Sequence, residues 1–331
     1  MLLLDAIFLV LVAFLLAYLI RHYLFTITAL YHHDTQVSRE LQGMSYQPKV
    51  TVLIPAYNEE KVIERTLRRM TELTYPKEKL EVITIDDGSG DRTREISEKF
   101  SKEYDFIKVI HRDPKKGGKG KAHALNEGLK HVNGEIVYCF DADYYPQQDI
   151  LEKLTASFVH PEIGGVQGRV VVLNEADTIV TRLVTLERIG GYRVDQVARE
   201  KLRLIPQFGG TVGGFRKRIL DQLGGWDTDI LAEDTDLTFR IYLAGYRIRY
   251  VNEAECYEEA VRDWRSYWHQ RYRWALGHMQ CAFKHLWPLL KSRKLQWREK
   301  LDGFFLLNVY FVPLLVGLAW IIGLVSYFTQ P

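Results

Sequence analysis

Residues 134–146 read GEIVYCFDADYYP, an apolar and β-branched run that ends in two aspartates one residue apart, Asp141 and Asp143. A short apolar run of this kind is typical of a buried strand. Two ionised carboxylates a few ångströms apart cannot both be buried without partners, because lost hydration and mutual repulsion cost more than one strand recovers. The stretch therefore predicts a strand whose end faces a ligand that carries positive charge.

The same design occurs three more times on the N-terminal side. Apolar strands are predicted at 50–56, 80–86 and 106–112, and segments with helical spacing of apolar residues follow at 59–70, 92–100 and 121–131. Near-continuous apolar strands that alternate with helices predict an α/β fold with a mostly parallel sheet covered on both faces. Ligands of such sheets bind at the carboxyl ends of the strands, so Glu59, Asp86, Asp87, Asp141 and Asp143 are expected to share one edge.

Composition limits the classes of function. The chain has 331 residues, 47% of them hydrophobic, and a net charge of +2, so no strong basic field points to nucleic acid. Its three cysteines, Cys139, Cys256 and Cys281, are far apart and are expected to be free thiols rather than zinc ligands. Neither a dinucleotide-binding glycine fingerprint nor a complete P-loop is present, which excludes those two nucleotide-binding classes.

Both ends of the chain are apolar. Residues 2–20 contain one charged residue, Asp5, and residues 303–328 contain none, so each is long enough to cross a bilayer. A signal peptide is the alternative for the first segment, but its basic residue, Arg21, follows the apolar run instead of preceding it. Basic residues flank the inner ends of both segments, which predicts an integral membrane protein whose residues 21–302 face the cytoplasm. Pro313 is expected to kink the second segment.

Between these segments, residues 284–300 alternate tryptophan and leucine with lysine and arginine, as an amphipathic helix at a membrane interface does. An ordinary surface helix is the alternative. Four parts of the chain are therefore predicted: a transmembrane helix with its juxtamembrane segment (1–31), a cytoplasmic domain (32–282), an amphipathic interface helix (283–302) and a C-terminal transmembrane helix (303–331).

Six ordered motifs carry a family resemblance: TVLIPAYNEE (51–60), IDDGSGD (85–91), KGKAHALNEGL (119–129), FDADYYP (140–146), AEDTDLTFR (232–240) and QRYRW (270–274). Together they resemble the family 2 glycosyltransferases of the GT-A fold, above all the membrane-embedded branch of cellulose, chitin, hyaluronan and poly-N-acetylglucosamine synthases. The resemblance runs from about residue 50 to residue 280. It implies a metal-dependent, inverting transferase that uses a UDP-sugar.

The resemblance also implies a role for each matching residue. The nucleotide and donor pocket would comprise Ala56, Tyr57, Glu59, Asp86, Asp87, Lys121 and Asp141. Asp143, with Asp141, would bind Mg²⁺ or Mn²⁺; Gln270, Arg273 and Trp274 would contact the diphosphate and the acceptor. Asp234 would be the general base with Glu233 beside it, and Asp236 is the alternative base. A solvated charge run is the alternative for the lysines at 119 and 121, and a helix N-terminus for the acids at 233–236.

Three functions remain open at this level. The first is addition of sugars to a growing polysaccharide, and the second is a single transfer to a membrane lipid. Two predicted spans are too few to enclose a channel for a polymer. Polysaccharide synthesis would therefore require oligomerisation or further spans beyond this sequence. The third function, nucleotide binding without catalysis, is disfavoured because Asp86, Asp143, Asp234, Arg273 and Trp274 are all present.

Overall fold

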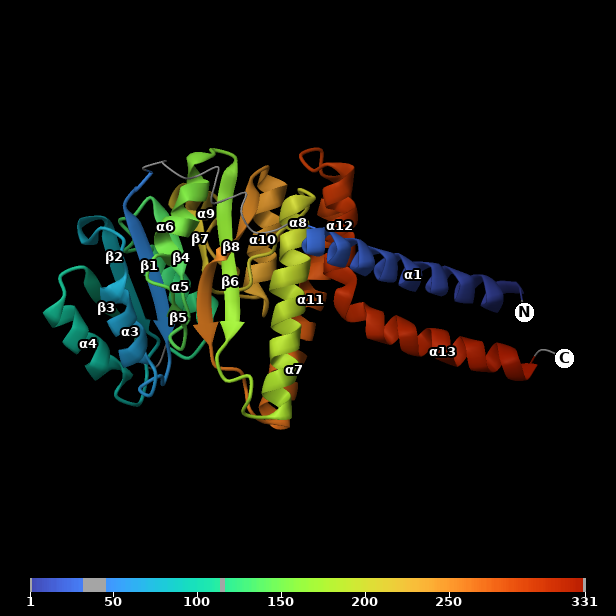
Figure 1. Cartoon of the computed structure of the whole chain (residues 1–331), viewed down its shortest axis with the longest axis horizontal. Helices are drawn as coiled ribbons and strands as arrows, with labels where there is room; N and C mark the ends of the chain where they lie inside the picture. The colour runs from blue at the N-terminus through green and yellow to red at the C-terminus, as the bar shows by residue number, and fades with distance from the viewer. Residues whose placement is uncertain (1, 32–45, 114–116, 330–331) are drawn as a thin grey trace.

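The computed structural model of the chain describes residues 2–31, 46–113 and 117–329. Within them one eight-stranded sheet forms the centre of the domain, in the order β3-β2-β1-β4-β7-β6-β8-β5 (Figure 1). The strands are β1 (Val50–Ala56), β2 (Leu80–Asp86), β3 (Ile107–His111), β4 (Ile136–Cys139), β5 (Tyr145–Pro146), β6 (Ile163–Val172), β7 (Gly213–Arg216) and β8 (Arg247–Glu258). The predicted start of the domain, at residues 32–45, lies outside the described residues.

The helices connect these strands and extend beyond them. Those of the domain are α3 (Ile63–Glu72), α4 (Thr93–Glu103), α5 (Lys121–Leu129), α6 (Ile150–Thr155), α7 (Ile179–Arg188), α8 (Val197–Lys201), α9 (Lys217–Leu223), α10 (Glu233–Ala244) and α11 (Trp264–Lys291). A π-helical segment, η3 (Ile189–Gln196), joins α7 to α8. The remaining helices are α1 (Leu2–Tyr31), α12 (Trp297–Asn308), the short 3₁₀ segment η4 (Val309–Phe311) and α13 (Val312–Thr329).

The predicted parallel strands are confirmed. β3, β2, β1 and β4 run parallel in register, with Val50 beside both Leu80 and Ile136. β7 then lies antiparallel between β4 and β6, so the sheet is mixed rather than wholly parallel. Buried apolar side chains pack on both faces, as continuous apolar strands require. All three cysteines are buried free thiols, as expected.

The two apolar ends lie side by side. α1 and α13 leave the domain together and run in the same general direction away from it (Figure 1). The two helices pack against each other: a Cβ added at Gly323 of α13 would lie 3.5 Å from the ring of Phe8 on α1. The segment Leu4–Tyr31 of α1 and the segment Trp297–Thr329, which contains α13, are each long and apolar enough to cross a membrane.

The structure corrects the boundaries at the C-terminal end. The predicted amphipathic helix at 283–302 is not one helix: α11 continues to Lys291, the chain turns, and α12 begins at Trp297. Residues Phe305, Leu306 and Leu307 of the predicted span are buried in the domain instead. The helix breaks at η4, immediately before Pro313, because proline lacks the N–H that a continuous helix needs there. The chain therefore leaves the domain at α13.

Arg21, which the sequence marks only as a basic residue after the apolar run, ties α1 to the domain. Its guanidinium lies 3.4 Å from the buried carboxylate of Asp302 on α12. The same carboxylate accepts hydrogen bonds from Arg199 Nε (3.2 Å) and from the backbone N–H of Ile205 (3.2 Å). Asp302 thus connects α12 to α1, to α8 and to the backbone at Ile205.

We expect Asp302→Ala to lower the free energy of unfolding by about 3–5 kcal/mol, because it removes the nearer carboxylate from two buried guanidinium groups and leaves them only Asp195, at 3.9 Å from each. Thermal unfolding of the detergent-purified chain measures this effect. Asp177→Ala is the matched control, since Asp177 pairs with Arg262 at the exposed surface. Its expected change is within about 0.5 kcal/mol. Equal melting temperatures for the parent chain and Asp302→Ala would contradict this account of how α1 is held.

Candidate active site

One cavity of about 1160 Å³ opens at the carboxyl ends of β1, β2 and β4. Every residue predicted for the site lines it except Asp86. The lining residues that were predicted are Ala56, Tyr57, Glu59, Asp87, Lys121, Asp141, Asp143, Glu233, Asp234, Gln270, Arg273 and Trp274. They come from segments as far apart in the sequence as β1 and α11. Four of the acids expected at the carboxyl ends of the strands therefore share one edge, and residues of α5, α10 and α11 complete the lining.

The two aspartates at the end of β2 occupy different places. Asp86 is fully buried, and its carboxylate pairs with His111 Nδ1 (2.5 Å) and accepts the backbone N–H of Ser89. Asp87 faces the cavity, where it accepts from Arg112 and from the N–H of Gly118 (3.0 Å). Burial raises the pKa of Asp87 although Arg112 opposes the shift. Of the pair, Asp87 is the one that a ligand can reach.

A glycine loop covers Asp87. A Cβ at Gly117 would lie 2.1 Å from the carbonyl oxygen of Asp87, so only glycine fits there. Gly118 has φ +67°, and a Cβ added to Gly118 would lie 3.4 Å from the ring of Tyr57. The loop, Tyr57 and Asp87 therefore form one compact end of the cavity, with an exposed aromatic ring above a carboxylate.

Asp141 is paired in this structure. Lys121, at the first position of α5, binds its carboxylate and donates to the carbonyl oxygen of Gly210 (2.8 Å). Burial disfavours the ammonium group, but Asp141 and Glu233 outweigh that effect and raise the pKa of Lys121. The alternative of a solvated charge run is therefore wrong for Lys121, which is held inside the cavity.

Asp143 has a different environment. Burial, with Asp141 next, raises the pKa of Asp143 to about 6, and burial together with Asp143 and Asp141 raises the pKa of Glu59 to about 7. Among the residues that the structure describes, no basic side chain pairs with the Asp143 carboxylate; Arg65 bonds its backbone carbonyl instead. Glu59, Asp141 and Asp143 thus converge in the cavity, where Lys121 pairs with Asp141.

This donor set fits a hard divalent ion that completes its coordination with phosphate oxygens, because Mg²⁺ is usually held by one or two carboxylates plus substrate phosphates. No group of three or more His, Cys, Asp or Glu side chains with metal-binding geometry occurs in residues 2–31, 46–113 and 117–329. A protein-only metal cage is therefore absent from that part of the chain, and the fit depends on the two aspartates.

Glu233 and Asp234 open α10, as predicted. A Cβ at Gly210, which has φ +87°, would lie 3.2 Å from Asp234 Oδ2, so the glycine lets the neighbouring loop approach this carboxylate. Burial, followed by the charge of Asp234, raises the pKa of Glu233 to about 7. Burial and the neighbouring carboxylate therefore both disfavour the ionised form of Glu233.

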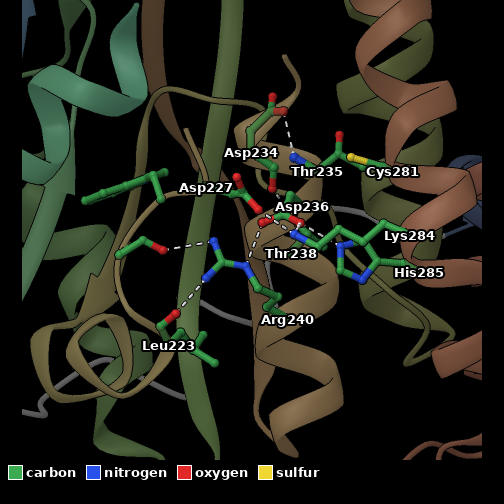
Figure 2. A network of polar contacts seen from close by, with 12 residues as sticks. Leu223, Asp227, Asp234, Thr235, Asp236, Thr238, Arg240, Cys281, Lys284 and His285 are labelled. Atoms are coloured by element: carbon green, nitrogen blue, oxygen red, sulfur yellow. Dashed lines mark hydrogen bonds and ion pairs between the residues drawn. The ribbon is translucent and has the colours of Figure 1, made fainter. Parts of the chain in front are cut away.

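Asp236 is excluded as the alternative base. It is fully buried beneath the cavity, and three side-chain nitrogens surround it: Arg240 Nε (2.6 Å), Lys284 Nζ (2.6 Å) and His285 Nε2 (2.7 Å), as Figure 2 shows. Burial opposes ionisation, but His285 and Lys284 outweigh it and hold the pKa of Asp236 well below its usual range. This network joins α10 to α11 and fixes the helix that carries Asp234.

Gln270, Arg273 and Trp274 lie on α11, as the spacing predicted, and all three line the cavity. The indole of Trp274 is already in contact with guanidinium groups: Arg271 Cζ lies 4.3 Å and Arg188 Cζ 5.4 Å from its ring centre. Glu187 binds Arg271, and Glu258 binds Arg188 (2.5 Å to Nε). The predicted aromatic surface is therefore present, with cations beside it.

The sequence interpretation missed the wall formed by α7, η3 and α8. The residues of this wall that line the cavity recur at helical spacing: Val184, Arg188, Gly191, Tyr192, Asp195, Gln196 and Arg199. That spacing is the one signal in the sequence that could have revealed the wall. The far end of the cavity reaches the base of the apolar helices, where Arg21, Phe305, Leu306, Val309, Tyr310 and Pro313 line it. The cavity thus extends from the end at Tyr57 and Asp87 to the helices that leave the domain.

Curated proteins of known sequence resemble the chain over most of its length. The probable glycosyltransferase YdaM of Bacillus subtilis is 39% identical over 280 residues, which cover 84% of this chain and 66% of that protein. The β-monoglucosyldiacylglycerol synthase of Trichormus variabilis is 34% identical (83% and 58% covered), and the poly-β-1,6-N-acetyl-D-glucosamine synthase of Staphylococcus epidermidis is 31% identical (78% and 60%). The chain spans about three fifths to two thirds of the length of these relatives.

Solved structures match the fold. The mannosyltransferase PcManGT from Pyrobaculum calidifontis, in complex with GDP-Man and Mn²⁺, has a TM-score of 0.70 and 26% identity, covering 99% of this chain and 88% of that one. Staphylococcus aureus TarS 1–349 in complex with UDP has a TM-score of 0.56 at 21% identity, covering 79% and 70%, and supports the fold alone. The sheet therefore has the GT-A arrangement. A model of the glycosyltransferase-like family 2 matches residues 48–277, and the chain belongs to that family.

Proposed function

We propose that the protein is a membrane-bound, inverting glycosyltransferase that moves a sugar from a UDP-sugar to a growing saccharide chain. The observation that carries this proposal is the single cavity: it contains the Asp87 and Tyr57 end, the acids Asp143 and Asp234, and Trp274. A donor bound at the first end would place its anomeric carbon toward α10.

The chemistry follows from the carboxylates. Asp234 accepts the proton of the acceptor hydroxyl while the hydroxyl oxygen attacks the anomeric carbon. The bond from that carbon to the diphosphate oxygen breaks, and the nucleoside diphosphate leaves with the bonding electron pair. One displacement from the face opposite the leaving group inverts the configuration, and only one basic carboxylate is required for it.

A divalent ion is part of the proposal. Asp143 and Asp141 would hold Mg²⁺ or Mn²⁺ against the diphosphate, and the ion, when bound, would neutralise the charge that develops on the leaving group. Lys121 lies within hydrogen-bonding range of Asp141 and can turn its ammonium group toward the same phosphates. PcManGT, with 26% identity, was solved with Mn²⁺ and a nucleotide sugar, which supports this assignment.

The nucleotide end supports UDP. An ionised carboxylate has about four lone-pair positions, and Asp87 uses two of them, for Arg112 and for Gly118. The remaining positions can accept the imide N–H of uracil, and the ring of Tyr57 offers a face for stacking. Guanine also presents an N–H donor, and PcManGT binds GDP-Man, so GDP-sugars are the comparison donors in the test below.

A saccharide acceptor agrees with the side chains beyond Asp234. Three aromatic and three amide or imidazole side chains line that part of the cavity: Trp274, Tyr192, Tyr310, Gln196, Gln207 and His278. Aromatic faces with nearby hydrogen-bonding groups suit a pyranose ring, which presents C–H groups on its faces and hydroxyls at its edge.

Transfer to a membrane lipid is the second candidate. The end of the cavity nearest α13 is apolar, with Phe305, Leu306, Val309 and Pro313 in its lining. The acyl chains of a lipid would suit these side chains. The glycerol hydroxyl of the same lipid could then reach Asp234 from the side of the apolar helices. A curated relative with 34% identity is a β-monoglucosyldiacylglycerol synthase, which supports this alternative.

The membrane part of the proposal is supported by α11. Its exposed apolar residues form one stripe along the helix: Trp264, Trp268, Tyr272, Leu276, Phe283, Trp287 and Leu290. α11 lies across the direction in which α1 and α13 leave the domain (Figure 1). A helix parallel to the bilayer surface with tryptophans on one face is typical of the membrane interface. The interfacial segment would therefore begin at residue 264 rather than 283.

We expect a spin label at position 268 to be in the lipid headgroup region of a vesicle. Trp268→Cys can be labelled selectively because the three native cysteines are buried. Oxygen, which concentrates in the bilayer, should relax this label more strongly than a water-soluble nickel chelate does. Lys99→Cys on α4, at the opposite end of the domain, is the control and should give the reverse order (Figure 1). Equal accessibility at the two positions would contradict an interfacial α11.

The proposed function is tested by nucleotide release from the detergent-purified protein with Mn²⁺ or Mg²⁺. UDP-glucose, UDP-N-acetylglucosamine, UDP-galactose and GDP-mannose are compared as donors, and radiolabelled product is sized. A metal-dependent polymer supports the saccharide acceptor, whereas a chloroform-soluble single adduct supports the lipid. No release from any donor, with a membrane extract supplied as acceptor source, would refute the assignment as a transferase.

A further inference from the structure

His278 occupies a junction of the cavity that none of the six motifs predicted. It lies on α11 one turn after Trp274 and lines the cavity. Its Nδ1 is 2.9 Å from the carbonyl oxygen of Trp274. Because a carbonyl oxygen only accepts, this contact selects the tautomer that carries a proton on Nδ1, in which Nε2 is an acceptor.

Nε2 faces the residue that follows the candidate base. It lies 3.2 Å from Oγ1 of Thr235, whose backbone N–H is 2.6 Å from Asp234 Oδ1. The same hydroxyl oxygen is 2.6 Å from Nε2 of Gln207, an amide nitrogen that only donates. Thr235 therefore accepts from Gln207 and has its single proton left for His278. The contacts form one connected chain: Gln207 donates to Thr235, Thr235 to His278, and His278 to the backbone of Trp274. Nε2 of Gln207 also lies 3.4 Å from Nε2 of His278, so the first and third side chains touch directly as well.

The imidazole also touches the base of the apolar helices. Its ring centre lies 4.7 Å from that of Tyr310, in the η4 break between α12 and α13. Thr235 is fully buried, so its hydroxyl has no freedom to exchange these partners for water. His278 is thus in contact with α10, with the segment of Gln207, and with the point where the chain leaves the domain.

We infer that His278 is a positioning residue, which fixes the distance between the base Asp234 and the acceptor surface at Trp274. This inference rests on the proposed function. A hydroxyl bound against Trp274 reacts only if Asp234 lies in line with its proton, and displacement of about 1 Å can cost ~100-fold in rate. The imidazole sets that relation because it bonds the residue adjacent to the base and the backbone of the acceptor residue.

The test uses four single variants of the full chain and one double variant, with the donor that the parent turns over. His278→Phe keeps a ring against Tyr310 but removes the polar contacts of both ring nitrogens, and Thr235→Val removes the hydroxyl at nearly constant volume. His278→Gln places an amide oxygen near the position of Nε2. His269→Phe, on the exposed side of the same helix, is the control.

We expect His278→Phe and Thr235→Val each to lower kcat about 10- to 100-fold, with the donor KM within about twofold of the parent. The double variant should lose no more than the worse single variant, because both changes break one chain. His278→Gln should recover at least a third of the parent kcat, and His269→Phe should equal the parent. Melting temperatures of all variants identify any that fails to fold, in which case His278→Gln and Thr235→Val decide.

An unchanged kcat in folded His278→Phe or Thr235→Val, or losses that multiply in the double variant, would overturn the positioning role while the transferase assignment stands. A rise in donor KM with constant kcat would overturn it as well, since that pattern belongs to donor binding. A parent chain that turns over no donor would overturn the proposed function first and this inference with it.

Discussion

Asp234→Asn is expected to lower kcat about 1000-fold, within the range of 10²–10⁴ that a general base supplies. The asparagine keeps the volume and the hydrogen bond from the N–H of Thr235 but cannot take a proton. Donor binding should persist, because Asp87, Lys121 and Asp143 are untouched. Steady-state nucleotide release and calorimetric titration of UDP with Mn²⁺ measure the two quantities separately.

The control for this substitution is Asp229→Asn, an exposed carboxylate five positions earlier in the same segment that does not line the cavity. It should retain the parent kcat. Turnover by Asp234→Asn above a tenth of the parent rate would show that another group accepts the proton. Glu233 would then be the next residue to replace, since Asp236 is enclosed by Arg240, Lys284 and His285.

Asp143→Asn is expected to weaken Mn²⁺-dependent UDP binding by about two orders of magnitude or more, because a metal contributes several kcal/mol of charge stabilisation at a diphosphate. In the parent chain, Mn²⁺ with UDP should raise the melting temperature, since a ligand that binds only the folded state stabilises it. In Asp143→Asn this rise should disappear. Removing one of three converging acids should at the same time leave the metal-free protein as stable as the parent or more so.

Asp149→Asn serves as the matched control, since Asp149 pairs with Lys153 at the exposed start of α6. Its UDP affinity and its thermal response to Mn²⁺ should equal those of the parent. Asp143→Asn with unchanged Mn²⁺-dependent affinity would remove the metal from the proposal. Lys121, which already pairs with Asp141, would then be the principal cation for the diphosphate.

The placement of the sheet and most of the site was predictable from local patterns. Polar residues lie at or shortly after the end of each strand in the N-terminal half, and parallel strands bring such ends to one edge whatever the rest of the chain does. That rule alone put Glu59, Asp87, Asp141 and Asp143 together, and the structure lines one cavity with all four. Helical spacing likewise placed Gln270, Arg273 and Trp274 on one helix.

Other features depend on contacts between distant segments, which spacing along the chain does not encode. Nothing local separates Asp86 from Asp87: His111, 25 positions away, takes the first, and the glycine loop leaves the second open to the cavity. The role of Asp236 depends in the same way on Lys284 and His285 of another helix. Hydrophobic periodicity also could not show where α11 ends, because a turn at residues 292–296 interrupts a pattern that remains amphipathic.

Residue types and their spacing were enough to identify the family, the sheet edge that carries the acids, and the two apolar ends, because these features depend on short stretches of sequence. Contacts between distant segments set which acids face the cavity, where α13 leaves the domain, and how Gln207, Thr235, His278 and Trp274 are connected. Hydrogen bonds and burial act between side chains that are close in space, and proximity across 28 to 71 positions arises only when the chain has folded.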